Sequence, residues 1–318
     1  MKQELLVKNI QCVQTNGQGK VCGGSLTLHE DKNVLKCQRC GNQYQSIGDV
    51  PILKPETDDS WYEQVDAEYK KIYSDRSRSL DIESNYLAYE REFMGQFVRE
   101  HKIQGPCLEI GCGTGLFAEI VPNFIGLDYY LELLLAEGFE SFNRLCADGR
   151  YIPLADASVE CVYSFNALEH IPDVELAFSE MDRVLKPGGF LVLKPAWHCA
   201  WYNNELILVL PYQQLNARQK IVKGLLPILQ SKLYKGLTRI PWRILRRMTS
   251  SKNNSLSWEK LTPYQGELWR GGDVDAVASI DCHEGILYYQ SRGYQCLSHP
   301  SLFKQILAGH DLAVLRKP

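Results

Sequence analysis

The sequence has 318 residues, enough for one large domain or two smaller ones. It is 45% hydrophobic and 23% charged with a net charge of −3, a composition typical of a soluble globular protein, so the overall charge gives no argument for a nucleic-acid partner. No apolar run is long enough to span a bilayer, no signal peptide is visible, and the eleven cysteines favour a reducing cytoplasm.

The first 55 residues hold four cysteines near turn-forming glycines, at Cys22-Gly-Gly and at the knuckle Cys37-Gln-Arg-Cys40-Gly. Four thiolates at two hairpin ends would form a tetrahedral zinc site, and so small a module needs a metal to fold. Nine residues separate Cys12 from Cys22, where a zinc ribbon has about two to four. Either residues 14–20 form an inserted loop, or the site is imperfect with His29 as a substitute ligand, or the thiols are unrelated. The predicted zinc ligands are Cys12, Cys22, Cys37 and Cys40.

Residues 54–60 are polar and contain proline, which suits a domain boundary. Aromatic residues at near-helical spacing follow over 61–73, and a second helical pattern covers 81–101. We therefore expect a linker with leading helices before the next domain.

Beyond residue 105, short apolar strands alternate with helical segments. The strand 107–110 runs into Gly111-Cys-Gly-Thr-Gly115, whose glycines allow positive φ and leave no Cβ between backbone and ligand; a helix is expected from about residue 116. Later strands end in Asp128 and Asp148, where carboxylates can accept hydrogen bonds from ribose hydroxyls and an exocyclic adenine amine. The alternation predicts a parallel sheet with its site along the carboxyl strand ends. The glycine spacing is not GxGxxG, which makes NAD binding the weaker alternative.

Five motifs in this order resemble the class I S-adenosylmethionine-dependent methyltransferases, in particular the small-molecule group with a Leu-Lys-Pro-Gly-Gly signature. The resemblance implies an α/β fold: a Rossmann-like doubly wound sheet of the seven-stranded methyltransferase type, closed by an antiparallel hairpin of strands at 293–297 and 312–317. The N-terminal module resembles the zinc-ribbon-like segment that precedes some bacterial methyltransferases. The motifs are Leu108-Glu-Ile-Gly-Cys-Gly-Thr-Gly115, Gly126-Leu-Asp128, Ala147-Asp148, Leu168-Glu-His170 and Arg183-Val-Leu-Lys-Pro-Gly-Gly189.

The resemblance implies S-adenosylmethionine as cofactor and a structural zinc ion. Asp128 would bind the ribose, Asp148-Gly149 would lie near adenine, and Asn166 would lie beside the methionine part. The expected domains are a ribbon-like module at 1–55, a linker with leading helices at 56–104, and a methyltransferase domain at 105–318. The full set of implied cofactor residues is Glu109, Gly111, Gly113, Gly115, Asp128, Asp148, Gly149 and Asn166.

An insertion at about 196–270 interrupts the last domain. Its residues 206–258 contain ten Lys or Arg and no Asp or Glu, interleaved with apolar residues at helical spacing. Three interpretations compete: a lid whose apolar face covers the site, a surface that rests on an anionic membrane, and a grip for a phosphorylated acceptor such as a nucleotide sugar, a lipid-linked glycan or RNA. We favour a lid that also contacts an anionic or lipid-carried substrate, peripheral at the inner membrane surface.

Methylation of an oxygen requires a group that accepts the hydroxyl proton, and the candidates are His170, His198, His283, Asp273 and Asp275. The sequence predicts in-line methyl transfer to a small-molecule, sugar or lipid-linked glycan acceptor. A ribosomal-RNA guanine methyltransferase is one alternative, because a zinc ribbon also precedes that domain, and a non-catalytic protein that retains the fold is another. Nucleic acid is the less expected partner.

Overall fold

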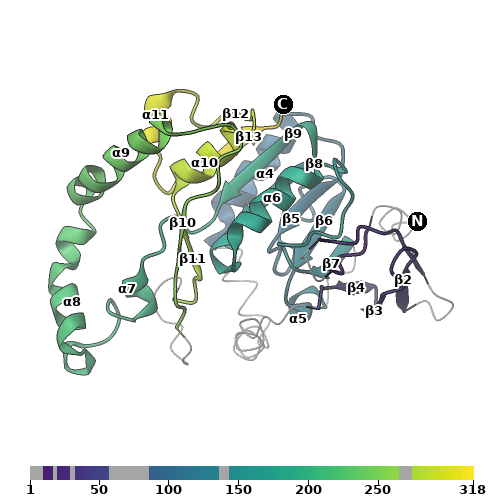
Figure 1. Cartoon of the computed structure of the whole chain (residues 1–318), viewed down its shortest axis with the longest axis horizontal. Coiled ribbons are helices and arrows are strands. Elements are labelled where there is room, and N and C mark those ends of the chain that lie inside the picture. Colours follow the sequence, from purple (N-terminus) through teal and green to yellow (C-terminus); the bar gives the residue numbers. More distant parts are fainter. Residues whose placement is uncertain (1–9, 17–19, 29–32, 57–85, 136–142, 265–273) are drawn as a thin grey trace. The chain divides into compact units, whose positions relative to one another are not determined.

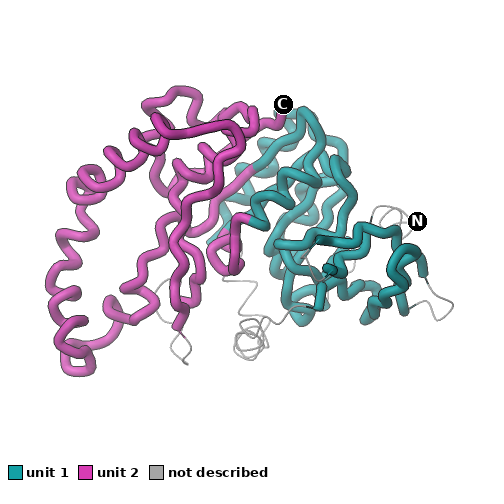
Figure 2. Tube along the Cα trace, viewed as in Figure 1, with its two compact units in different colours: residues 1–165, 176–191 teal, residues 166–175, 192–318 magenta. Residues whose placement is uncertain are grey.

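The computed structural model describes residues 10–16, 20–28, 33–56, 86–135, 143–264 and 274–318. The chain divides into two compact units, one of residues 1–165 and 176–191 and one of residues 166–175 and 192–318 (Figure 2). The expected division at residues 55 and 104 stays a prediction. No helix among the described residues is long and apolar enough to cross a membrane.

Unit 1 is built on one sheet, with the strand order β1-β2-β3-β4-β7-β6-β5-β8-β9 (Figure 1). Two longer helices, α4 (Ala88–Glu100) and α6 (Val174–Val184), and the short α5 (Leu131–Leu134) accompany it. The strands are β1 (Leu26–Leu28), β2 (Val34–Cys37), β3 (Gln43–Ile47), β4 (Val50–Leu53), β5 (Cys107–Ile110), β6 (Phe124–Asp128), β7 (Asn143–Ala147), β8 (Val159–Phe165) and β9 (Leu185–Lys194).

The central strands are parallel and buried along their whole length. β5 pairs with β6 and β8, and β6 pairs with β7, all in parallel register. Every residue of β5 and β6 is buried, as expected for strands covered on both faces. Their carboxyl ends therefore meet at one edge of the sheet, which is where parallel sheets place their ligands.

The cysteine-bearing segment extends this sheet. β1, β2, β3 and β4 are antiparallel neighbours, and β4 then pairs in parallel with β7, Ile52 opposite Cys146. A second link is the ion pair between Arg144 of β7, which is buried, and Asp49 in the turn before β4. The ribbon-like module is thus part of the sheet of unit 1.

The prediction of a helix from about residue 116 is wrong. Residues 113–121 instead form turns and a bend, with hydrogen bonds to the residue three back such as Gly115 N to Cys112 O at 2.8 Å and Ala118 N to Gly115 O at 3.0 Å. The Phe117 ring packs against Tyr163 and Phe165 of β8, with centroids 5.6 and 5.2 Å away, and this packing anchors the turns. The first leading helix expected at 61–73 lies outside the described residues.

Unit 2 contains the insertion and the end of the chain. Its closing strands confirm the predicted hairpin: β12 (Gln295–Cys296) pairs antiparallel with β13 (Ala313–Arg316). β10 (Trp258–Lys260) and β11 (Ala278–Ile280) form a separate two-stranded sheet. The other elements are η1 (Leu168–His170), α7 (Trp201–Asn204), η2 (Tyr212–Gln214), α8 (Ala217–Leu229), α9 (Lys232–Met248), α10 (Cys282–Gln290) and α11 (Leu302–Ile306).

Candidate functional site

Three glycines hold the turn after β5 in the left-handed region. The angle φ is 73° at Gly111, 51° at Gly113 and 80° at Gly115. Gly111 N–H donates to the carbonyl of Leu127 at 2.8 Å, which ties the turn to β6. A side chain at these positions would be strained, and without one the backbone is open to close approach by a ligand.

Asp128 ends β6 directly beside this turn. Its Oδ2 accepts from Gly113 N–H and its Oδ1 from Tyr130 N–H, both at 2.9 Å. Burial raises the pKa of this carboxyl to about 6, while backbone hydrogen bonds from Tyr130, Gly113 and Tyr129 and the positive charge of Lys54 lower it. Asp128 is therefore largely ionised at neutral pH, and each oxygen keeps a lone pair for a further donor.

Asp148 follows β7 and is also buried, but its carboxylate forms an ion pair with Arg150. The Arg150 guanidinium donates to both carboxylate oxygens, with Nη2 2.7 Å from Oδ2, and the Arg150 backbone N–H donates to Oδ1 at 2.9 Å. Gly149 between them is buried too. The sequence pattern does not reveal this pair, and an adenine amine at Asp148 would share the carboxylate with Arg150.

The two remaining residues predicted to bind cofactor lie at other strand positions. Glu109 is buried within β5, where its Oε2 is 3.5 Å from the Tyr163 hydroxyl. Asn166 directly follows β8, has a φ of 48°, and its N–H donates to the Lys194 carbonyl at 3.0 Å. Their contacts with a cofactor stay predictions.

His170 is the only one of the three candidate histidines with substantial exposure. Its Nδ1 is 3.1 Å from Asp275 Oδ2, its Nε2 is 3.8 Å from Glu169 Oε1, and a quarter of the side chain is exposed. The Val277 N–H donates to the Glu169 carbonyl at 2.8 Å, which fixes the loop of η1 against the segment carrying Asp275. The contact between His170 and Asp275 joins residues that are 105 positions apart in the chain. The other candidate acid, Asp273, lies outside the described residues.

His198 lies in a buried, basic surrounding. Its Nε2 is 3.5 Å from Arg243 Nη2, its Nδ1 is 3.6 Å from Asp281, and its ring centroid is 5.3 Å from that of His310. Burial, followed by the charges of Arg239 and Arg243, lowers the pKa of His198 to about 2. A base of such low pKa accepts a proton poorly near neutral pH.

His283 has no exposed surface. Its Nε2 accepts from Arg247 Nε at 3.1 Å, and its Nδ1 lies 3.5 Å from the buried Glu284. A fully covered, hydrogen-bonded imidazole inside α10 cannot touch an acceptor in this conformation.

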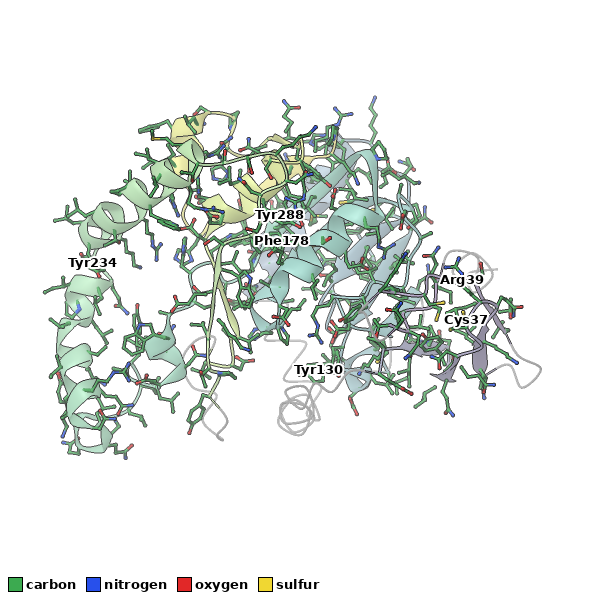
Figure 3. The ribbon with its side chains drawn as sticks, viewed as in Figure 1. Cys37, Arg39, Tyr130, Phe178, Tyr234 and Tyr288 are labelled. Atoms are coloured by element: carbon green, nitrogen blue, oxygen red, sulfur yellow. The ribbon has the colours of Figure 1, made fainter. Side chains whose placement is uncertain are left out.

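The structure brings the four N-terminal thiols together. All four sulfur atoms lie within 4.8 Å of one another, with Cys12 Sγ 3.5 Å from Cys40 Sγ and Cys22 Sγ 3.8 Å from Cys37 Sγ. The backbone N–H groups of Arg39 and Cys40 point to the Cys37 sulfur, at 3.3 and 3.5 Å. A Cβ at Gly24 would lie 2.6 Å from that sulfur, so only glycine fits there. Four thiolates in so tight a group fit tetrahedral zinc; Cys37 and Arg39 are labelled in Figure 3.

The described residues on the two sides of the long spacing between Cys12 and Cys22 pair with each other. Cys22 N–H donates to the Gln14 carbonyl at 2.8 Å, Asn16 N–H donates to the Lys20 carbonyl at 3.0 Å, and Thr15 lies opposite Val21 in an antiparallel bridge. Of the open alternatives, the inserted loop therefore agrees with the structure, and His29 lies outside the described residues.

The basic helix α9 turns its charged side toward the rest of unit 2. Arg243 pairs with Asp281 at 2.9 Å and Arg246 with Glu284 at 2.8 Å. The opposite side exposes between 41 and 80% of each apolar side chain; these are Leu233, Tyr234 (labelled in Figure 3), Leu237, Trp242, Ile244, Leu245 and Met248. The lid interpretation expects solvated charges and a covered apolar face, so the observed orientation is the reverse; the lid itself stays a prediction.

Comparison with known proteins identifies the central segment. Residues 108–193 match the family model described as a methyltransferase domain. Residues 108–193 are a class I methyltransferase domain. The match begins within β5 and ends within β9, so it contains the glycine turn, Asp128 and Asp148.

Curated relatives each match less than half of the chain. A protein of Mycolicibacterium smegmatis described as a probable S-adenosylmethionine-dependent methyltransferase is 37% identical over 123 residues, 36% of this chain and 47% of the relative. A demethylmenaquinone methyltransferase of Corynebacterium urealyticum is 32% identical over 90 residues, 27% of this chain and 39% of the relative. The chain spans less than half the length of these two relatives.

Solved structures similar to part of this chain include an S-adenosylmethionine-bound amino pentose methyltransferase from Micromonospora echinaspora. It is 29% identical, with a TM-score of 0.31, and the match covers 34% of this chain and 50% of that one. Streptomyces venezuelae DesVI is 22% identical with a TM-score of 0.32, covering 35% and 51%. The cysteine module and the basic helices lie outside the segment that matches the methyltransferase domain.

Proposed function

We propose that the chain is an S-adenosylmethionine-dependent methyltransferase. The observation that carries the proposal is the glycine turn of positive φ beside Asp128, whose buried carboxylate is bonded by the turn itself. When bound, S-adenosylmethionine supplies a methyl group on an activated sulfonium. The chain holds the donor: Asp128 accepts hydrogen bonds from ribose hydroxyls, and Asp148 with Gly149 lies at the neighbouring strand end for adenine.

This proposal is tested by titrating the protein calorimetrically with S-adenosylhomocysteine. Wild type is expected to bind, and Asp128→Ala is expected to lose binding by about tenfold or more, because hydrogen bonds to a charged group contribute about 1.5–3 kcal/mol each. The matched control is Glu92→Ala, which removes an exposed carboxylate of α4 and should bind as wild type does. Absence of binding by wild type would overturn the proposal.

For an oxygen acceptor, we assign the proton-accepting role to His170. The Asp275 carboxylate lies 3.1 Å from Nδ1 of His170, and the partial exposure of His170 leaves it accessible. As the new methyl–oxygen bond forms, the imidazole takes the hydroxyl proton. Because the leaving group is already activated, most of the acceleration comes from alignment of donor and acceptor, with the base as a smaller contribution.

The acceptor, in this proposal, is a small molecule, sugar or glycan that carries phosphate or is linked to a lipid. A basic cluster on α9 supports the proposal that the acceptor carries phosphate. Lys235, Arg239 and Arg243 recur one turn apart on this helix, and the neighbouring acid Asp281 pairs with Arg243. Burial lowers the pKa of both Lys235 and Arg239; repulsion from Arg239 adds to the effect at Lys235, while at Arg239 the charge of Asp281 opposes it and that of Arg243 adds to it. An anionic group placed beside these two side chains would stabilise their charged forms.

The exposed apolar side of α9 supports the proposal that the acceptor is linked to a lipid. Ile221, Leu225 and Ile228 of α8 add three further apolar side chains that are 44–66% exposed. The ten basic and no acidic residues of 206–258 complement an anionic bilayer. We therefore propose peripheral contact with such a membrane, where a lipid-carried acceptor would be found.

A further inference from the structure

The residue that follows β4 reaches the proposed donor site from the cysteine module. β4 pairs with β7 in parallel, with Leu53 opposite Ala147, so Lys54 lies level with Asp148 at the carboxyl edge of the sheet. On the other side of β7, Asp128 of β6 lies opposite Cys146. A segment whose polar, proline-bearing sequence suits a linker thus adds a side chain to the row of strand ends that holds the two acids.

The ammonium of Lys54 lies close to the Asp128 end of this row. Its Nζ is 3.7 Å from the centroid of the Tyr129 ring, and Tyr129 is the neighbour of Asp128 in the chain. The same charge acts on Cys146 of β7, where burial raises the thiol pKa to about 11 and Lys54 opposes the rise. Lys54 is half-buried and is therefore only partly screened by water.

Asp128 needs such a charge. Its carboxyl is buried, which favours the protonated form; the backbone N–H groups of Tyr130 and Gly113, then the charge of Lys54, then the backbone N–H of Tyr129 oppose this effect. The other titratable groups nearby do not help: Cys146 stays a neutral thiol, and Glu132 of α5 carries the wrong sign. A protonated carboxyl has fewer acceptor sites for ribose hydroxyls.

We propose that Lys54 is a positioning residue of the donor site: its ammonium keeps Asp128 ionised, so that the carboxylate accepts hydrogen bonds from the ribose hydroxyls of an adenosyl group. The proposal rests on the proposed function. It also gives the cysteine module a direct part in binding the donor, since the module contributes β4 and Lys54 directly follows this strand.

The test is a titration with S-adenosylhomocysteine from about pH 5.5 to about pH 9, using wild type, Lys54→Met and Lys54→Arg. Without the ammonium the pKa of Asp128 rises, so Lys54→Met is expected to bind more weakly below the new pKa, by about tenfold for each unit of rise. The deficit should disappear toward pH 9, where Asp128 is ionised in every variant. Lys54→Arg should restore wild-type behaviour, and Lys36→Met, an exposed lysine of β2 in the same module, serves as the matched control.

A loss of affinity that is equal at every pH would indicate a merely structural role and overturn the proposal, as would unchanged affinity in Lys54→Met. A second measurement does not depend on the cofactor: the carboxyl ¹³C signal of Asp128, assigned by its absence in Asp128→Asn, is followed with pH in the free protein. The proposal expects a midpoint near pH 6 in wild type and a higher one in Lys54→Met. Wild type that fails to bind S-adenosylhomocysteine would overturn the proposed function, while the carboxyl titration still decides the role of Lys54.

Discussion

At the scale of single residues, two buried acids at neighbouring strand ends differ in what balances their charge. Asp148 is held by the guanidinium of Arg150, which occupies both of its oxygens. Asp128 is held by two backbone N–H groups and by the more distant Lys54. Asp128 is therefore the acid whose charge is less fully satisfied within the protein and more available to an incoming pair of hydroxyls.

The contact between His170 and Asp275 leads to a kinetic prediction. Replacing His170 by Ala should lower the rate of methyl transfer by about 10²–10⁴-fold, the usual contribution of a general base. Asp275→Asn should give a smaller loss and an altered pH profile, because the ring loses the carboxylate that orients it. Binding of S-adenosylhomocysteine should be unchanged in both variants.

The measurement follows labelled methyl transfer from S-adenosylmethionine to a bacterial lipid and glycan extract. An unchanged rate in His170→Ala would remove this histidine from the mechanism. A parallel loss of S-adenosylhomocysteine binding would instead indicate damage to the fold.

The sequence predicts some of these residues and not others, for a physical reason. The glycines of 111–115 and the acid of Asp128 leave a local pattern, because a tight turn and a strand end are formed by neighbours in the chain. The partners Lys54 and Asp275 are 74 and 105 positions away from the residues they act on, Asp128 and His170. Nothing in local spacing predicts which distant side chain reaches a site.

At the scale of elements, α9 shows how far an amphipathic pattern can be interpreted. The pattern predicts the helix, but two opposite orientations satisfy it: apolar burial on one side or ion pairing on the other. The arginine side of α9 faces inward because two acids at the start of α10 form ion pairs with it. Asp281, the N-cap of α10, pairs with Arg243, and Glu284 pairs with Arg246. Because those acids lie almost forty residues further along the chain, the orientation could not be predicted from the helix itself.

The outward apolar side leads to a membrane-binding prediction. Replacing both Leu233 and Leu237 by Ser should weaken binding to vesicles rich in phosphatidylglycerol by about tenfold or more, since each buried leucine contributes about 1.5–3 kcal/mol. Binding should also fall with rising salt. Leu28→Ser, on an exposed strand position of β1, is the matched control.

The assay is vesicle flotation. Failure of wild type to float with anionic vesicles would remove the membrane contact. If wild type instead binds RNA with strong salt dependence, the basic segment serves a nucleic-acid acceptor.

At the scale of the whole molecule, the cysteine module and the central sheet of unit 1 form one continuous structure. The expectation of an α/β sheet closed by an antiparallel hairpin is confirmed, because alternating strands and helices dictate it. The pairing of β4 with β7 was not predicted, since residues 52 and 146 share no local pattern. A metal bound at the four thiols would therefore stabilise more than a detached ribbon.

Removal of the metal should therefore act on the donor site as well as on stability. A strong chelator, or Cys37→Ser, is expected to lower the unfolding midpoint by several degrees and to weaken binding of S-adenosylhomocysteine, because β4 and Lys54 lose their anchor. Metal analysis, thermal unfolding and calorimetry check this in the full chain. Cys161→Ala, a buried thiol of β8 outside the cluster, is the control for loss of a cysteine alone. A protein that keeps both properties after the metal is gone would contradict the coupling.

The path of the chain between the two units has a consequence for taking the protein apart. The chain changes unit three times, after residues 165, 175 and 191. A break after residue 165 deprives unit 1 of most of α6 and β9, a break after residue 191 deprives unit 2 of the loop with His170, and a break after residue 175 leaves both units incomplete. A single cut by a protease, or a truncation, at any of these crossings therefore leaves at least one unit incomplete.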